Sequence, residues 1–151
     1  MKKRIHLVFS PVIFFLIIGC VGLGAISTEG LNIQRVIAVQ GSQTEIYDSS
    51  MVWLVEIFGS VEQPLEYRNR ETGEVIRKVS FTYHSDVWNA PQTVYFTIYI
   101  QARDNRSRIT ITKISKRDGV YKSEYEDVKN ALALVIDDYE AYIIARSLDE
   151  W

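Results

Sequence analysis

Histidine chemistry could arise at only one place beyond the N-terminal segment of this sequence. His6 lies in that segment, and His84 precedes Ser85 and Asp86. A nucleophilic serine needs a base held against it and a third group that orients the base. Because adjacent residues on an extended chain point apart, these three residues make a weak constellation for hydrolysis. We interpret His84 as a solvated residue and predict no catalytic residue.

Clustered carboxylates are the second group that could do chemistry. Asp137 and Asp138 are adjacent in a predicted helix, where neighbouring side chains face different directions. A second cluster occupies the predicted first turn of that helix, where the helix dipole favours negative charge: Glu124, Glu126 and Asp127. Helix geometry accounts for both clusters without a metal, so no metal site and no cofactor is predicted.

Aromatic side chains on a loop are better candidates for function. A predicted loop from Tyr83 to Gln92 carries Trp88 beside His84 and Asp86 in a polar stretch. Large aromatic residues on loops are enriched at recognition sites. Alternatively, Trp88 folds back on the sheet and serves packing alone.

A second candidate surface is a sheet face that carries Tyr67, Tyr95 and Tyr99. If helices leave this face uncovered, the tyrosines could bind a protein partner or a sugar. If both faces are covered, the tyrosines belong to the core.

The first twenty residues indicate export. A basic start, Lys2-Lys3-Arg4, precedes an apolar stretch over residues 7–18, and these are parts of a secretory signal. Ile17-Ile18-Gly19-Cys20 resembles a bacterial lipobox, whose cysteine is acylated after cleavage just before it. The single cysteine of the chain stands at the position that a lipoprotein requires. We predict a signal peptide over residues 1–19 and lipidation of Cys20.

The alternative for this segment is an uncleaved membrane anchor, because residues 7–28 carry no charge and form a stretch long enough to span a bilayer. Because of its glycines, the segment is less apolar after Ile18, so the signal peptide is the better interpretation. Residues 20–30 are then a small, polar tether. Either way, the folded part faces the periplasm or the exterior and is attached to a membrane of the cell envelope.

The charge balance argues against nucleic acid as a partner. Without residues 1–19 the chain has 14 basic and 19 acidic residues, and nucleic-acid binders usually have a basic surplus. An acidic body is also not drawn to anionic lipid headgroups. Acyl chains, rather than a basic patch, are therefore expected to hold the protein at the membrane.

A single domain over residues 31–151 is predicted from the apolar pattern. Alternating residues predict strands over 31–40, 64–70, 74–83, 93–101 and 108–114. A capping-box pattern at Ser42 and helical spacing predict one helix from Ser42 to Gly59, with Trp53 at the edge of its apolar stripe. A second capping-box pattern at Ser123 predicts another helix to about Arg146. Asp138 lies off the apolar stripe of this second helix, which consists of Val128, Leu132, Val135, Ile136, Tyr139 and Ile143. The order β-α-β-β-β-β-α indicates an α+β fold, with both helices on one face of a mostly antiparallel sheet.

Three pieces between Val39 and Ile114 resemble a family of bacterial exported proteins. They are an opening strand and helix with Tyr47, Trp53 and Phe58, the hairpin at residues 70–76, and an aromatic strand that runs into the basic turn at residues 103–106. The family is domain of unknown function 4468, which has a TATA-binding-protein-like (TBP-like) fold. The resemblance implies a curved sheet and no known activity or functional residue.

These observations favour a small, membrane-anchored, non-enzymatic lipoprotein that binds an envelope protein or a glycan. The alternative is a periplasmic enzyme, or an inhibitor of one, with its site near the loop from Tyr83 to Gln92.

Overall fold

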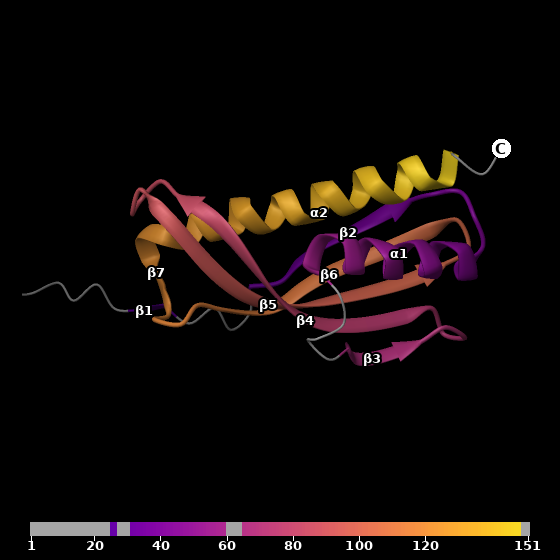
Figure 1. The fold of residues 1–151 in the computed structure, drawn as a ribbon, viewed down its shortest axis with the longest axis horizontal. Helices are drawn as coiled ribbons and strands as arrows, with labels where there is room; N and C mark the ends of the chain where they lie inside the picture. Colours follow the sequence, from indigo (N-terminus) through magenta and orange to yellow (C-terminus); the bar gives the residue numbers. More distant parts are fainter. Residues whose placement is uncertain (1–24, 27–30, 60–64, 149–151) are drawn as a thin grey trace, which may run out of the picture.

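Two helices lie on one face of a five-stranded sheet, and a two-stranded sheet lies at one end of the molecule (Figure 1). The computed structural model describes residues 25–26, 31–59 and 65–148. The elements in chain order are β1 (Ala25–Ile26), β2 (Ile33–Ala38), α1 (Gln43–Phe58), β3 (Leu65–Asn69), β4 (Glu74–Ser85), β5 (Ala90–Arg103), β6 (Arg106–Ser115), β7 (Val120–Tyr121), a 3-10 turn (Lys122–Glu124) and α2 (Tyr125–Leu148).

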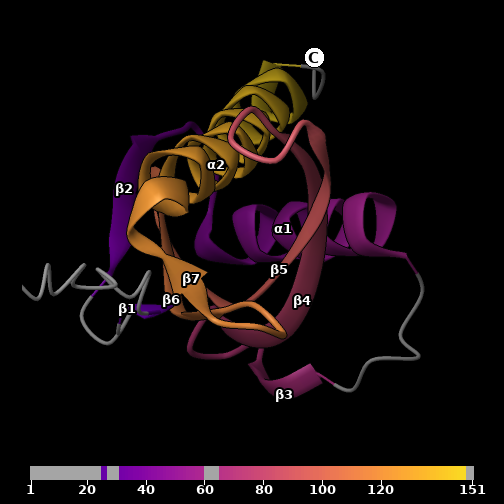
Figure 2. The same cartoon turned by 90° about the vertical axis from the view of Figure 1, so that its left-hand side faces the viewer.

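The large sheet has the strand order β2-β6-β5-β4-β3, and every neighbouring pair is antiparallel. Seen end-on, its strands curve around the helix layer (Figure 2). The predicted α+β class, the element order and the curved antiparallel sheet are confirmed. The sequence pattern did not predict β1 and β7, which pair with each other. Strand β1 lies within the segment predicted to be a tether.

The core lies between the helices and the sheet. Helix α1 begins with the predicted capping box, in which Ser42 and Glu45 satisfy each other's backbone N–H groups. Trp53 was expected at the edge of the apolar stripe, and this prediction is wrong. Its side chain is fully buried and stacks edge-on against Tyr139 of α2 and Phe58. The buried stripe of α1 is therefore centred on Trp53.

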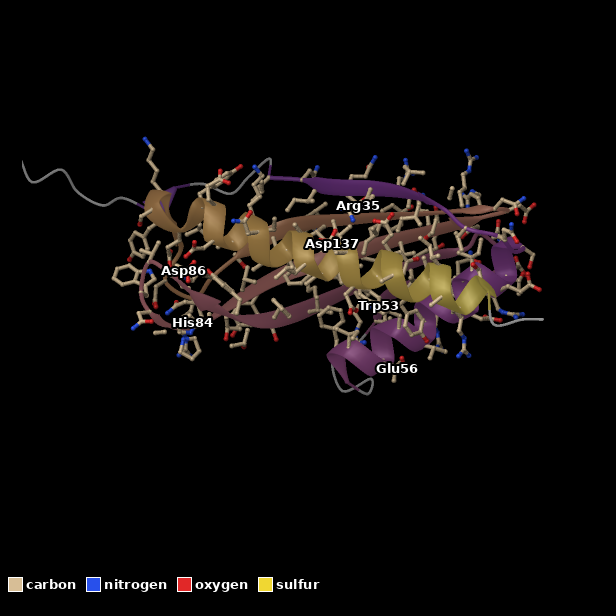
Figure 3. The ribbon with its side chains drawn as sticks, turned by 90° about the horizontal axis from the view of Figure 1, so that it is seen from above. Arg35, Trp53, Glu56, His84, Asp86 and Asp137 are labelled. Atoms are coloured by element: carbon tan, nitrogen blue, oxygen red, sulfur yellow. The ribbon has the colours of Figure 1, made fainter. Side chains whose placement is uncertain are left out.

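Two arginines interrupt the apolar pattern of the strands, and both bind the helices. Arg35 of β2 donates to the carboxylates of Asp137 and Glu140 on α2, each at 2.6 Å (Figure 3). Arg77 of β4 is buried and donates to the carbonyls of Leu54 and Gly59. It thereby ties β4 to the C-terminal end of α1.

A close approach of the backbone explains the glycine in the hairpin that joins β3 and β4. Gly73 has φ +66°, and its carbonyl accepts the N–H of Ala102 at 2.7 Å. A Cβ at this position would lie 2.5 Å from the carbonyl oxygen of Ala102. Both the turn and the strand contact therefore require glycine.

The predicted loop from Tyr83 to Gln92 is wrong in extent. Strand β4 continues to Ser85 and β5 begins at Ala90, so only residues 86–89 form the turn of a long hairpin. His84 pairs with Pro91 in the antiparallel register. The polar composition of this stretch concealed the strands, because their outer face is solvated there.

Helix α2 confirms the predicted apolar stripe. Its members are buried against the sheet and α1: Val128, Leu132, Val135, Ile136, Tyr139 and Ile143. The predicted capping box at Ser123 is wrong. A 3-10 turn precedes α2, and the side chain of Glu124 accepts the backbone N–H of Tyr121 at 3.0 Å.

Candidate functional site

Trp88 is fixed along one edge and exposed over the rest of its surface. Its indole Nε1–H donates to Oε1 of Glu124 at 2.6 Å, and its ring meets that of Tyr121 edge-on at 6.3 Å. The residue is nevertheless 51% exposed. Trp88 therefore folds back on the protein and still presents a large apolar surface to solvent.

Glu124 anchors this arrangement from inside the protein. It is fully buried and accepts hydrogen bonds from the ammonium of Lys116, the backbone N–H of Tyr121 and the indole of Trp88. Burial acts to raise the pKa of Glu124, but these three donors outweigh it and lower the pKa. Glu124 is therefore a buried carboxylate with three donors, rather than a solvated residue of a helical turn.

The hairpin turn is tied to α2 by a second carboxylate. Ser85 Oγ donates to Oδ2 of Asp127 at 2.8 Å, and the backbone N–H of Val87 reaches the same oxygen at 3.4 Å. Ser85 also accepts the backbone N–H of Trp88 at 3.4 Å. Because the turn is bonded to α2 at several points, the exposed face of Trp88 has a fixed orientation.

A cavity of about 310 Å³ opens beside this turn, between β4 and α2. Its walls combine apolar and polar groups, which are Phe81, Tyr83, His84, Asp86, Asp127, Asn130, Ala131 and Leu134. Leu134 is 63% exposed. Ligand sites commonly combine such apolar walls with a few polar groups. We name this cavity, together with Trp88, Tyr121 and Glu124, the tip site.

The hydroxyl of Tyr83 is the unusual polar group of the tip site. It is buried and has no hydrogen-bond partner among the described residues. Burial, together with the negative charges of Glu124 and Asp127, raises its pKa to about 12. The phenol is therefore a neutral donor that a bound acceptor could satisfy.

His84 and Asp86 lie at this same end of the molecule (Figure 3). His84 is exposed, and its Nε2 lies 3.3 Å from Oδ1 of Asn89. Since Ser85 donates to Asp127, the hydroxyl of Ser85 is not paired with this imidazole. No cluster of three or more metal-ligating side chains is present in residues 25–26, 31–59 and 65–148.

The tyrosines of the second candidate surface lie on the sheet face opposite the helices. Tyr95 is 48% and Tyr67 42% exposed. Tyr99 is half-buried, and its hydroxyl donates to Glu74 at 2.8 Å. Of the two alternatives for this surface, the uncovered face holds for the described elements. The structure separates these tyrosines from the tip site.

Sequence reasoning missed Glu124 and Tyr121 as members of the tip site. Their spacing of three residues is a capping-box pattern, and this was the one available signal. Nothing local indicated that Trp88 and Lys116 would supply further donors. Cys20 lies outside the described residues, and no described helix is long and apolar enough to cross a membrane.

Comparison with known proteins identifies the family. The model of DUF4468, a domain of unknown function with a TBP-like fold, matches residues 34–117, which is more than half of the chain. No curated protein matches the sequence.

Two solved structures resemble this fold, each at 12% sequence identity. A TBP-like protein from Parabacteroides distasonis ATCC 8503 aligns with a TM-score of 0.59 over 84% of this chain and 98% of its own. A DUF4468 family protein from Bacteroides ovatus ATCC 8483 aligns with a TM-score of 0.56 over 83% and 91%. At this identity the likeness concerns the fold alone. By its family match, the chain belongs to the DUF4468 family of TBP-like domains.

Proposed function

We propose that this protein is a lipid-anchored, non-enzymatic binding module of the cell envelope, and that the tip site holds its partner. The anchor is Cys20, with residues 1–19 as a cleaved signal peptide. The support is the basic start, the apolar stretch and the Ile17-Ile18-Gly19-Cys20 tetrad. Acyl chains on Cys20 would hold the folded domain close to the membrane surface.

The observation that carries the binding role is the arrangement of Trp88. Its indole is half-exposed, and its edge is bonded to the buried Glu124. A tryptophan that is already ordered loses little conformational freedom when a partner covers it, which favours binding. Aromatic anchors of this kind dominate the energy of many interfaces.

The cavity beside the hairpin turn favours a partner that offers both apolar and hydrogen-bonding groups. Phe81, Ala131 and Leu134 provide apolar surface, whereas Asp86, Asp127 and Asn130 provide polar groups. An envelope protein segment or a glycan has this mixed character. The tip site thus agrees with a recognition role.

The enzyme alternative has less support at the same site. His84 contacts Asn89, and Ser85 donates to Asp127. Acyl transfer by a serine requires the base to contact the nucleophile. The geometry at the tip therefore favours binding over hydrolysis.

Lipidation is tested by Cys20→Ser in cells fed a labelled fatty acid. We expect the variant to lose acyl labelling and to accumulate as the longer precursor. Normal labelling and processing of the variant would contradict the anchor.

Binding is tested by chemical cross-linking of the intact lipidated protein in cells, followed by mass spectrometry of the adducts. We expect Trp88→Ala to lower the yield of specific adducts at least tenfold. Ile57→Ala is the matched control, because Ile57 is exposed to a similar degree on α1, outside both candidate surfaces. An adduct pattern that Trp88→Ala leaves unchanged would contradict a partner at the tip site.

A further inference from the structure

Charge in this domain is segregated between its two layers. The helices α1 and α2 carry eight acidic residues and two basic ones, which are Glu45, Asp48, Glu56, Glu126, Asp127, Asp137, Asp138, Glu140, Lys129 and Arg146. The strands β2 to β6 show the reverse, with eight basic and two acidic residues: Arg35, Arg68, Arg77, Lys78, Arg103, Arg106, Arg108, Lys113, Glu66 and Glu74. The net negative charge of the chain conceals this difference.

Three arginines of the sheet gather at the hairpin that joins β5 and β6. Arg103 and Arg106 are register partners at the end of this hairpin, and Arg108 pairs with Gln101 two register positions further in. Their neighbours Ala102, Ser107 and Ile109 are buried on the helix side. Because side chains alternate along a strand, the three arginines share the outer face.

The arginines surround a depression on that outer face. It has a volume of about 220 Å³ and is lined by Val36, Gln101, Arg103, Arg106, Ser107 and Arg108. Val36 of β2 provides an apolar floor, since it is the register partner of Arg108 and is 59% exposed. The depression has room for a group of several non-hydrogen atoms.

Two of the three guanidinium groups have no counter-charge within the part of the chain that the structure describes. Arg106 and Arg108 make no side-chain hydrogen bond or ion pair among the described residues, and both are exposed. Arg103 donates to the carbonyls of Thr72 and Ala102 and lies 3.9 Å from Glu74.

Asp104 in the hairpin turn accepts the backbone N–H of Gln43 at 2.8 Å, and Glu74 on the outer face is occupied as well. It accepts hydrogen bonds from the hydroxyl of Tyr99 and the amide of Gln101, each at 2.8 Å. Like charges that line one depression repel one another, and an anion bound between them offsets this repulsion. The site therefore has a positive charge that an external anion would neutralise.

We infer that the depression formed by Arg103, Arg106 and Arg108 binds a phosphoryl group. Guanidinium forks match the spacing of phosphate oxygens and can donate two parallel hydrogen bonds to them. Inorganic phosphate presents more acceptor oxygens and more charge than a carboxylate does to the three arginines that line the depression, and a phosphodiester keeps two free oxygens that match one guanidinium fork. The source of the group is a soluble phosphate or the headgroup of an anionic lipid, which have this chemistry in common.

The experiment is isothermal titration calorimetry on the full lipidated chain in neutral detergent micelles. The probes are inorganic phosphate, glycerophosphoglycerol as the headgroup diester, and glutarate as a dicarboxylate, all at one fixed ionic strength. We expect saturable binding of at least one phosphoryl probe. We expect Arg108→Gln to lower the affinity for that probe about tenfold or more, because a charge-assisted hydrogen bond contributes at least this much. Lys113→Gln, an exposed cation elsewhere on this face, is the control and should bind as the unmodified protein does.

Preference for the diester would assign the site to a lipid headgroup, and preference for inorganic phosphate would assign it to a soluble ligand; both outcomes support the inference. Circular dichroism of each variant verifies that the fold is kept. Absence of saturable binding by both phosphoryl probes would overturn the inference. The inference would also be overturned if Arg108→Gln bound the phosphoryl probe as tightly as the unmodified protein does, or if glutarate bound as tightly as that probe.

Discussion

The indole Nε1–H of Trp88 donates to a carboxylate oxygen of Glu124 at 2.6 Å, across 36 residues of sequence. This bond joins the turn between β4 and β5 to the entry of α2. The same carboxylate carries the ammonium of Lys116, which is itself almost fully buried. One buried side chain therefore fixes both the end of the hairpin and the aromatic surface that the hairpin presents.

The first prediction concerns the buried pair of Lys116 and Glu124. Glu124→Gln should lower the free energy of unfolding by about 3 kcal/mol, because it leaves the ammonium of Lys116 buried without a counter-charge. Urea denaturation measures this difference. Glu126→Gln is the matched control, since Glu126 is largely exposed, and it should change the free energy by less than about 0.5 kcal/mol. Equal effects of the two substitutions would refute the importance of the buried pair.

Stability should also depend on pH through Glu124. Its pKa in the folded protein lies below the ordinary value of 4.5, so the folded state binds the proton less readily than the unfolded chain does. The stabilising contribution is therefore fully present above about pH 4.5 and decreases as the pH falls through the folded pKa. We expect the difference in Tm between the unmodified protein and Glu124→Gln to shrink from pH 7 to pH 3.5. A constant difference over that range would contradict the assigned charge state.

A carboxylate of α2 that the helical pattern classed as a surface residue should prove important for stability. Asp138 accepts the indole N–H of the fully buried Trp53 at 2.8 Å. Asp138→Leu leaves that donor unsatisfied and should destabilise the fold by about 1–3 kcal/mol. In Asp137→Leu, Arg35 keeps its bond to Glu140, so the loss should stay below about 1 kcal/mol. Thermal or chemical denaturation compares the two, and equal losses would be the contrary result.

These carboxylates show where sequence reasoning reached its limit. Apolar periodicity depends on one element at a time, and it was sufficient for the order of strands and helices along the chain and for the α2 stripe. It left open whether the tyrosine face of the sheet is covered. The bonds of Asp138 to Trp53 and of Glu124 to Trp88 join distant elements. No local pattern encodes such partners, because they depend on how α1, α2 and the hairpin pack.

The predicted ends of β4 and β5 were wrong for a related reason. Polar residues near Ser85 looked like a loop, yet the register of β4 with β5 continues to Ala90. Where the β4–β5 hairpin extends beyond the core it has few apolar residues, so no apolar alternation indicates its strands there. The net charge of the chain likewise gave no indication of where the charges lie. The separation of acidic helices from a basic sheet face is visible only in the folded structure.

The packing of α2 can be tested with two leucines that lie two residues apart. Leu132 is fully buried, and Leu134 is 63% exposed. Leu132→Asp places a carboxylate in the core, which costs several kcal/mol of the about 5–15 kcal/mol that such domains have. We expect this variant to be unfolded or to have a much lower Tm, whereas the Tm of Leu134→Asp should stay within a few degrees of that of the unmodified protein. Similar melting of both variants would contradict the packing of α2 on the sheet.

The central claim, that the tip site receives the partner, is tested most directly by a photo-cross-linking amino acid at position 87 of the lipidated protein in living cells. Val87 is 45% exposed beside Trp88 in the hairpin turn. The control position is 144, where Ile144 is exposed to a similar degree near the C-terminal end of α2, at the opposite end of the molecule (Figure 1). We predict one discrete adduct from position 87 that disappears when Trp88→Ala is added, and no such adduct from position 144. An adduct that forms only from position 144, or that persists from position 87 without Trp88, would contradict the account.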